Sequence, residues 1–323
     1  MGDQAAPCPP RPSQTAVILI LVVFLPAALT LRSASHPREP LAVDLNPSPL
    51  GYTQSLTLFL FPVAILTIWF LMHPFYQLQR KAFWLTMGAL IPTGIFLDIL
   101  RANAYFRFPN RQAVLGIWVP VVGGEVPIEE FLFYALGFLA VLLTYIWCDE
   151  YWLAAYKVPD AGDPARSPRR VVRFHWPSLA IGAAACVAAI LYKRYLSGSP
   201  EGFPGYFIFL TLAAVVPSMF LYPTAAPCIN ARALSFTFFL LLLVSLLWEA
   251  TLAVPYQWWD YNPRQMVGIH VPAWCKLPLE ATLVWSVVSY ATVIWYEAMK
   301  VILGMKGRLR ERLFGIKAGR ETP

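Results

Sequence analysis

The chain has 323 residues, of which 58% are hydrophobic and only 13% are charged, and its formal net charge is +7. Soluble domains carry about 25% charged residues, so the composition excludes an ordinary soluble protein and favours an integral membrane protein. Lys and Arg mostly mark cytoplasmic loops in such proteins, so we do not interpret the positive charge as a nucleic-acid-binding surface.

Eight stretches are apolar and long enough for a membrane helix of about twenty residues. They are residues 15–33, 54–73, 83–100, 127–147, 176–193, 206–223, 232–253 and 278–303. The first is alternatively a signal peptide, but Arg11 precedes it and no clear cleavage site follows, which favours a retained helix. The sequence therefore predicts an all-α, multi-pass integral membrane protein with about eight transmembrane helices.

The distribution of basic residues indicates the orientation. With eight spans, the N-terminus, the even-numbered loops and the C-terminal tail lie on one side, and most Lys and Arg residues fall there. This places both termini in the cytoplasm of a protein of the cell membrane. The tail "KGRLRERLFGIKAGR" is expected to form a basic surface helix, with Leu309, Leu313 and Phe314 toward the membrane.

The chain also repeats itself. "GYTQSLTL" at residue 51 returns as "GYFIFLTL" at residue 205, and four further positions return 151 residues later. These are Asp98, Tyr105, Pro127 and Glu129, which match Glu249, Tyr256, Pro278 and Glu280. Four spans per copy give both copies the same orientation, which predicts two parallel four-helix repeats with a functional cleft between them. The expected organisation is a first membrane repeat, a polar linker, a second repeat and a basic cytoplasmic tail, at residues 1–158, 159–174, 175–304 and 305–323.

Acidic residues recur in or beside these apolar spans. They are Asp98, Glu129 and Glu130 in the first copy and Glu249 and Glu280 in the second. A charge at the bilayer centre costs about 2.5–3.5 kcal/mol even on the insertion scale, and desolvation favours the protonated form of a carboxyl group. A plain alternative is that each Glu behind a proline complements a helix dipole. That account explains neither the doubled Glu nor the recurring acidic partner one helix earlier, so we interpret these five residues as candidate acid–base groups.

Aromatic residues surround the acids. Phe133 and Tyr134 follow the Glu pair, while Trp258, Trp259 and Trp285 flank Glu280. Aromatic faces attract cations, so these five side chains are candidates for the wall of a substrate site that shelters a carbocation. The alternative is that they belong to the interfacial aromatic belts of a membrane protein.

Metal and cofactor signals are lacking in the sequence. The five cysteines and four histidines show no metal-ligand spacing, and no GxGxxG motif stands between a strand and a helix. We therefore expect no metal and no cofactor.

Three phrases resemble one known family. "VPIEEFLFY" (126–134), "LPLEATLVW" (277–285) and "WWDYNPRQMVGI" (258–269) are similar to the membrane-integral lycopene cyclases, in the form that fuses both repeats in one chain. The resemblance covers residues 51–300, and Pro-x-Glu-Glu is its most specific part. The phytoene synthase half of the fungal fused proteins has no counterpart after residue 303.

The resemblance implies an isomerase of carotenoid biosynthesis that needs no cofactor. Its substrate would be lycopene or a related linear carotenoid, and its partners the lipid bilayer and other enzymes of the carotenoid pathway, with no nucleic acid. An acid protonates C2 of the end group, the C5=C6 bond attacks the cation at C1, and a base removes a proton from the ring. Glu129 and Glu130, or one of them with Glu280, would fill these roles. In the second copy Ala281 stands in place of Glu130, so the copies are not equivalent.

Other functions fit the same features. A carotenoid hydratase or a C50-carotenoid cyclase uses the same protonation and differs in what captures the cation. A proton-coupled transporter also combines parallel repeats with intramembrane acids, and a structural membrane subunit is a further alternative.

Overall fold

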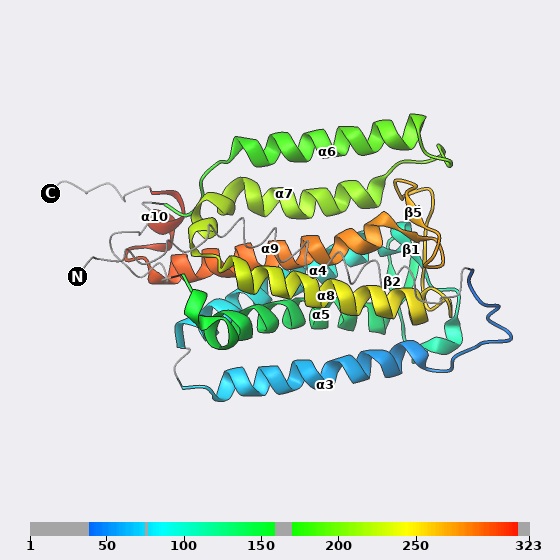
Figure 1. The fold of residues 1–323 in the computed structure, drawn as a ribbon, viewed down its shortest axis with the longest axis horizontal. Coiled ribbons are helices and arrows are strands. Elements are labelled where there is room, and N and C mark those ends of the chain that lie inside the picture. The colour runs from blue at the N-terminus through cyan, green and yellow to red at the C-terminus, as the bar shows by residue number, and fades with distance from the viewer. Residues whose placement is uncertain (1–38, 75–76, 159–169, 316–323) are drawn as a thin grey trace, which may run out of the picture.

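The computed structural model describes residues 39–74, 77–158 and 170–315. Within them, seven helices are long and apolar enough to cross a membrane, and they run side by side in an elongated bundle (Figure 1). They are α3 (Gly51–Met72), α4 (Gln77–Tyr105), α5 (Ile128–Trp147), α6 (Trp176–Tyr195), α7 (Gly205–Ala225), α8 (Ala231–Trp248) and α9 (Leu279–Gly304). The all-α, multi-pass prediction is confirmed. The predicted span 15–33 lies outside the described residues, so the count of eight stays a prediction.

Short strands join the spans at one end of the bundle. They form three antiparallel pairs: β1 (Phe106–Arg107) with β4 (Asp260–Tyr261), β2 (Trp118–Val121) with β3 (Gly124–Pro127), and β5 (His270–Val271) with β6 (Leu277–Pro278). Figure 1 shows them at the end of the bundle opposite α10 (Leu309–Phe314). The β1–β4 pair therefore connects two loops that lie far apart in the sequence.

Short helical turns complete the described chain. They are η2 (Arg111–Ala113), η3 (Cys148–Trp152), η4 (Ala154–Tyr156), η5 (Ala226–Cys228) and η6 (Glu249–Ala253). Two of them, η3 and η6, are π-helical and continue α5 and α8 directly. Single π-helical turns inside longer helices are frequent at functional sites.

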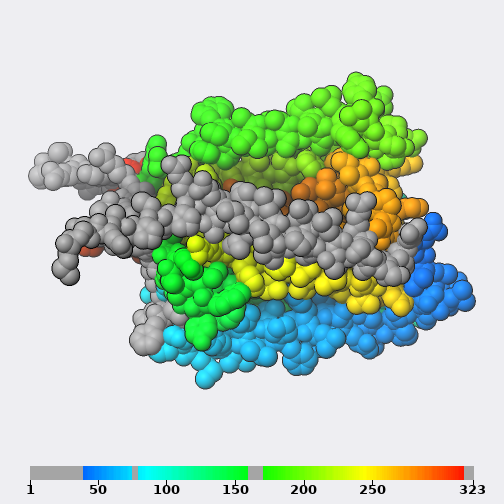
Figure 2. Space-filling model, viewed as in Figure 1, coloured from blue at the N-terminus to red at the C-terminus, as the bar shows by residue number. Residues whose placement is uncertain are grey.

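The central helices differ from the outer ones in burial. α5 and α9 are the most buried spans, whereas α3 and α6 are among the least buried and lie at opposite edges of the molecule (Figure 2). Phe61 and Ile65 on α3 and Ile181 on α6 are largely exposed. Exposed apolar side chains of this size on a bundle surface are expected to face lipid.

Two asparagine side chains, one in each half of the chain, donate equivalent hydrogen bonds to the backbone of the other half. The Asn110 side chain donates a hydrogen bond of 2.9 Å to the carbonyl of Tyr256, and the Asn262 side chain donates one of 2.9 Å to the carbonyl of Ala104. Each asparagine occupies the same place in its own half, shortly after the helix that precedes a strand pair. The described parts of the two halves therefore share local geometry, while the duplication of a whole four-helix unit stays a prediction.

The basic tail is described only in part. α10 is present, and Leu313 packs against the ends of α7 and α9, whereas Leu309 and Phe314 are exposed. The predicted linker lies largely outside the described residues.

Candidate functional site

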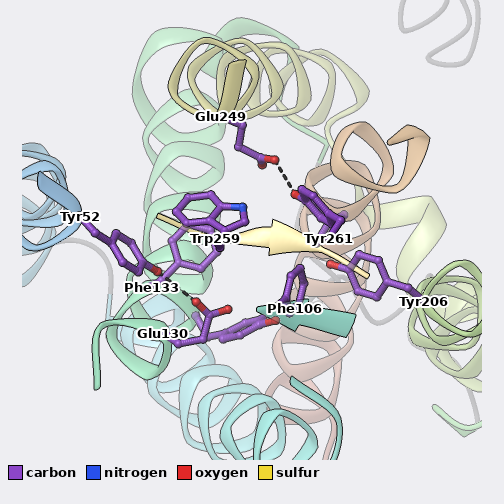
Figure 3. Close-up of a pocket in the computed structure, with 10 residues that line it drawn as sticks. Tyr52, Phe106, Glu130, Phe133, Tyr206, Glu249, Trp259 and Tyr261 are labelled. Atoms are coloured by element: carbon purple, nitrogen blue, oxygen red, sulfur yellow. Dashed lines mark hydrogen bonds between the residues drawn. The ribbon is translucent and has the colours of Figure 1, made fainter. Parts of the chain in front are cut away.

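A small cavity lies near the strand-bearing end of the bundle. Its volume is about 30 Å³, which holds one or two water molecules. The cavity is lined by two carboxylic acids, four tyrosines, two phenylalanines, one tryptophan and one valine: Glu130, Glu249, Tyr52, Tyr134, Tyr206, Tyr261, Phe106, Phe133, Trp259 and Val284. Five of these were expected as site residues from the sequence. Figure 3 shows the two carboxyl groups entering from opposite sides.

Glu130 enters the cavity from the first turn of α5. Pro127 is the extended residue that precedes this helix, and it suits a helix start because it lacks the N–H that would stay unpaired there. Glu130 is buried, and the hydroxyl of Tyr52 donates a hydrogen bond of 3.1 Å to its Oε2. Tyr52 is the second residue of α3, so the site depends on the contact between α3 and α5.

Glu249 reaches the cavity from the end of α8, where the π-helical turn begins. The Ser245 hydroxyl donates to its Oε1 over 2.9 Å, and the Tyr261 hydroxyl donates to its Oε2 over 2.5 Å. The two acids therefore differ in their surroundings, because Glu249 accepts two side-chain hydrogen bonds and Glu130 accepts one.

Tyr261 lies in the loop between α8 and α9. Burial raises the pKa of its phenol well above the ordinary value, and the nearby Glu249 carboxyl raises it further. The hydroxyl therefore stays protonated at neutral pH and remains a hydrogen-bond donor. Its strand, β4, pairs with β1, which places Tyr261 opposite Phe106.

The aromatic wall is continuous around the cavity. Trp259 lies 5.1 Å from Tyr52 between ring centroids, and Phe133 lies 5.5 Å from Trp285 in an edge-to-face contact. Trp258 stacks on Tyr52 behind the wall, at 6.2 Å and an interplanar angle of 16°. Of the predicted aromatic residues, Phe133, Tyr134 and Trp259 line the cavity, while Trp258 and Trp285 support residues that do.

Glu129 and Glu280 occupy equivalent places outside the cavity lining. Oε1 of Glu129 accepts a hydrogen bond of 2.7 Å from the Leu115 N–H, and Oε1 of Glu280 accepts one of 2.6 Å from the Val267 N–H. Thr53 also donates to Glu129 over 2.6 Å. Both carboxyl groups are buried and anchor the loop that precedes their own helix. Their predicted catalytic role stays a prediction.

Asp98 lies on α4 and is buried. Its Oδ2 has no hydrogen-bond partner among the described residues, and its carboxyl group is close enough to Glu130 for the two charges to interact. It is not one of the residues that line the cavity. Asp98 is therefore an acidic neighbour of the site.

Four aromatic residues that line the cavity were not predicted as site residues from the sequence. Tyr52 and Tyr206 are the second residues of the two repeated "GY" phrases, and each enters the cavity from the start of its helix. The repeat itself was the signal for them. Phe106 and Tyr261 face each other across β1 and β4, and no local pattern predicts that pairing. Val284, which also lines the cavity, is one of many apolar residues on α9.

Comparisons with known proteins were negative: no protein-family model, curated protein or solved structure matches the chain. Among the residues that the structure describes, no three or more His, Cys, Asp or Glu side chains are grouped to hold a metal ion.

Proposed function

We propose that the protein is a carotenoid cyclase that acts on the linear end group of lycopene or a related pigment. The observation that carries the proposal is the meeting of Glu130 and Glu249, from different helices, at one buried cavity with aromatic walls. The resemblance of the Pro-x-Glu-Glu phrase to the membrane-integral lycopene cyclases supports the same conclusion.

Glu130 is the proton donor in this proposal. Its carboxyl group has Asp98 as an acidic neighbour and accepts one hydrogen bond, from Tyr52. Two neighbouring carboxyl groups do not readily ionise together, and Glu130 is the one of this pair that lines the cavity. It gives the proton to C2 of the end group, and the C1=C2 double bond becomes a tertiary cation at C1.

Glu249 is the proton acceptor. The C5=C6 double bond attacks C1, so that a C1–C6 bond forms and the cation moves to C5. Glu249 then removes a proton from C6, which leaves a ring double bond between C5 and C6. Ser245 and Tyr261 both donate to this carboxylate, and donors of this kind stabilise its negative charge before the reaction. No electrons are gained or lost, and the proton returns from Glu249 to Glu130.

The aromatic wall excludes water from the cation. Trp259 and Phe133 present π-systems to the cavity, and such faces stabilise positive charge. The cavity is smaller than a carotenoid end group, so the substrate must displace lining side chains as it enters. A substrate that fills the cavity leaves little room for water beside the cation, and this favours capture by the alkene, the cyclase reaction, over capture by water, the hydratase reaction.

Pigment analysis tests the proposal directly. The gene is expressed in a bacterium that accumulates lycopene, and the extracted pigments are separated by chromatography. New ring-containing products are expected from the wild type, and none from Glu130→Gln or Glu249→Gln at equal amounts of membrane protein. Glu201→Gln is the matched control, because Glu201 is exposed and lies outside the cavity lining. Hydroxylated products would show that the protein is a hydratase rather than a cyclase. Unchanged lycopene would contradict both activities.

A further inference from the structure

One face of α9 carries polar side chains through the middle of the bundle. Trp285, Ser289, Thr292, Tyr296 and Lys300 follow one another at intervals of three or four residues, so they lie on one stripe of the helix. All five are buried. At about 1.5 Å per residue the stripe extends about 22 Å along the helix. Polar groups buried in a membrane helix are costly unless they find hydrogen-bond partners.

Three hydroxyl groups of this stripe have no hydrogen-bond partner among the described residues: those of Ser289, Thr292 and Tyr296. A helical Ser or Thr usually bonds to the carbonyl four residues earlier, as Ser235 and Thr237 do on α8. Ser289 and Thr292 do not. Buried hydroxyl groups without a protein partner are characteristic binding sites for internal water.

The stripe meets the candidate site at one end. The indole ring of Trp285 contacts Phe133, which lines the cavity, with 5.5 Å between ring centroids. Gly137 on α5 permits this approach, because a Cβ atom there would lie 3.1 Å from the indole ring. The Trp285 end of the stripe therefore lies directly behind the cavity wall.

At its other end the stripe meets a buried ionic cluster. Lys300 forms an ion pair with Glu297 at 3.3 Å and lies 5.4 Å from the ring centroid of Tyr296. The hydroxyl of Tyr145 donates to Glu297 over 3.0 Å. Titratable groups therefore stand where the stripe ends.

The cluster continues toward the surface through the π-helical turn η3. Asn230 donates a hydrogen bond of 2.9 Å to Asp149, and Glu150 forms an ion pair with Lys157 at 2.6 Å. The side chain of Lys157 is 24% exposed. Polar groups thus extend from a solvent-accessible lysine to the buried end of α9.

We propose that the polar stripe of α9 is a hydrated proton path between the Glu297–Lys300 cluster and the carboxyl groups of the cavity. Hydroxyl groups and water both donate and accept hydrogen bonds and can relay protons, whereas the Trp285 indole only donates. The three hydroxyl groups therefore relay protons along the stripe with water, and in this proposal water alone carries them past Trp285. The path goes beyond the proposed cyclase activity, because it serves any proton chemistry of Glu130 and Glu249.

Hydroxyl-radical footprinting of the purified protein in nanodiscs tests for the water. Radicals generated by an X-ray pulse label side chains that lie beside bound water, and mass spectrometry locates the labels. Tyr296 and Trp285 are expected to be labelled several-fold faster, relative to the unfolded protein, than Phe83. Phe83 is the control because it is fully buried in the same hydrophobic cluster as Trp285 and Tyr296, but lies on α4, away from the polar stripe. Labelling of Tyr296 no faster than that of Phe83 would overturn the path.

A variant pair tests whether the water is continuous. The double change Ser289→Ala with Thr292→Val removes two hydroxyl groups from the stripe and is expected to lower labelling of Tyr296 several-fold. The control is Ser286→Ala, because Ser286 lies about 100° from Trp285 around the helix and bonds to the carbonyl of Thr282. Equal labelling in both variants would show that water reaches Tyr296 from the cluster alone, and would overturn a continuous path.

Infrared spectroscopy after a change from H₂O to D₂O tests the movement of protons. The protonated carboxyl band lost in Glu130→Gln identifies the proton donor of the cavity. Exchange of its proton for deuterium is expected to be several-fold slower in the Ser289→Ala, Thr292→Val variant than in Ser286→Ala. Equal exchange rates would overturn the path, and neither outcome depends on any pigment, so cyclase activity is judged separately.

Discussion

Tyr261 donates a hydrogen bond of 2.5 Å to Glu249, while the strand that carries it pairs with Phe106 in the other half of the chain. The donor is therefore held by backbone contacts that do not involve the helix of Glu249. The carboxyl group and its hydrogen-bond donor come from separate elements, and each element is fixed independently. The pair is therefore preorganised and needs no conformational change.

Tyr261→Phe is expected to lower the rate of ring formation about ten- to hundredfold. A hydrogen bond to a charged group contributes about 1.5–3 kcal/mol, and about 1.4 kcal/mol corresponds to tenfold. The rate is measured from the accumulation of cyclic pigment in cells that produce lycopene. Tyr256→Phe, in the same loop, is the control and should keep wild-type rates. A Tyr261→Phe protein as active as that control would remove Tyr261 from the mechanism.

Substituting Glu129 and Glu130 one at a time should separate an effect on stability from an effect on activity. Glu129→Gln weakens charge-assisted hydrogen bonds from Leu115 and Thr53, and we expect a loss of about 1–2 kcal/mol in unfolding free energy. Glu130→Gln removes a buried carboxyl group from the cavity and should abolish product without lowering the unfolding temperature. Thermal unfolding in detergent and pigment chromatography, run on both variants, check the two expectations. The reverse result would exchange the roles of the two residues.

The sequence predicts where the spans lie because hydropathy follows burial in lipid directly. Residues 127–147 and 278–303 were expected as spans, and α5 and α9 occupy nearly the same residues. α4 is longer than its predicted span at both ends, since a hydropathy window stops at Arg80 or Arg101 whereas backbone hydrogen bonding continues past them. The sequence thus predicts which helices exist, but it predicts less accurately where a helix ends when charged residues lie nearby.

The site was predictable only in part. The choice between Glu129 and Glu130 depends on how α5 is rotated against its neighbours, because consecutive residues point about 100° apart on a helix. That rotation is set by contacts with Tyr52 and Thr53 on α3, which a local pattern does not contain. The pairing of β1 with β4 is likewise a long-range contact.

The asparagines between the halves should contribute to stability rather than to chemistry. Asn110 is fully buried and donates to two backbone carbonyls, those of Pro47 and Tyr256. Asn110→Ala leaves these carbonyls unpaired, and a loss of about 1–3 kcal/mol per unsatisfied group follows. Asn262→Ala should cost less, because its site is less buried. Asn46→Ala, at a partly buried position where the side chain makes a solvent-exposed hydrogen bond, is the control. Unfolding temperatures in the order Asn46→Ala, Asn262→Ala, Asn110→Ala, from highest to lowest, are expected.

Substitution of two glycines with similar φ angles should separate the cost of backbone strain from the cost of a steric clash. Gly116 has φ +82° and open space around a Cβ atom, whereas Gly202 has φ +91° and would place a Cβ atom 2.2 Å from the carbonyl oxygen of Arg264. Gly116→Ala should therefore lose about 1 kcal/mol from the left-handed conformation alone. Gly202→Ala adds a clash with rigid backbone and should lose about 2–4 kcal/mol.

The second glycine also matters for the cavity. The loop that contains Gly202 is bonded to the neighbouring loop through the Phe203 N–H and the Arg264 carbonyl at 2.8 Å, and through the Tyr206 N–H and the Gln265 carbonyl at 3.1 Å. A displaced loop would shift Tyr206, which lines the cavity. Gly202→Ala is thus expected to lower both the unfolding temperature and the yield of cyclic pigment, whereas Gly116→Ala lowers the unfolding temperature only slightly. Equal unfolding temperatures in the two variants would mean that the loops yield without cost, and that Tyr206 is not held in place by this contact.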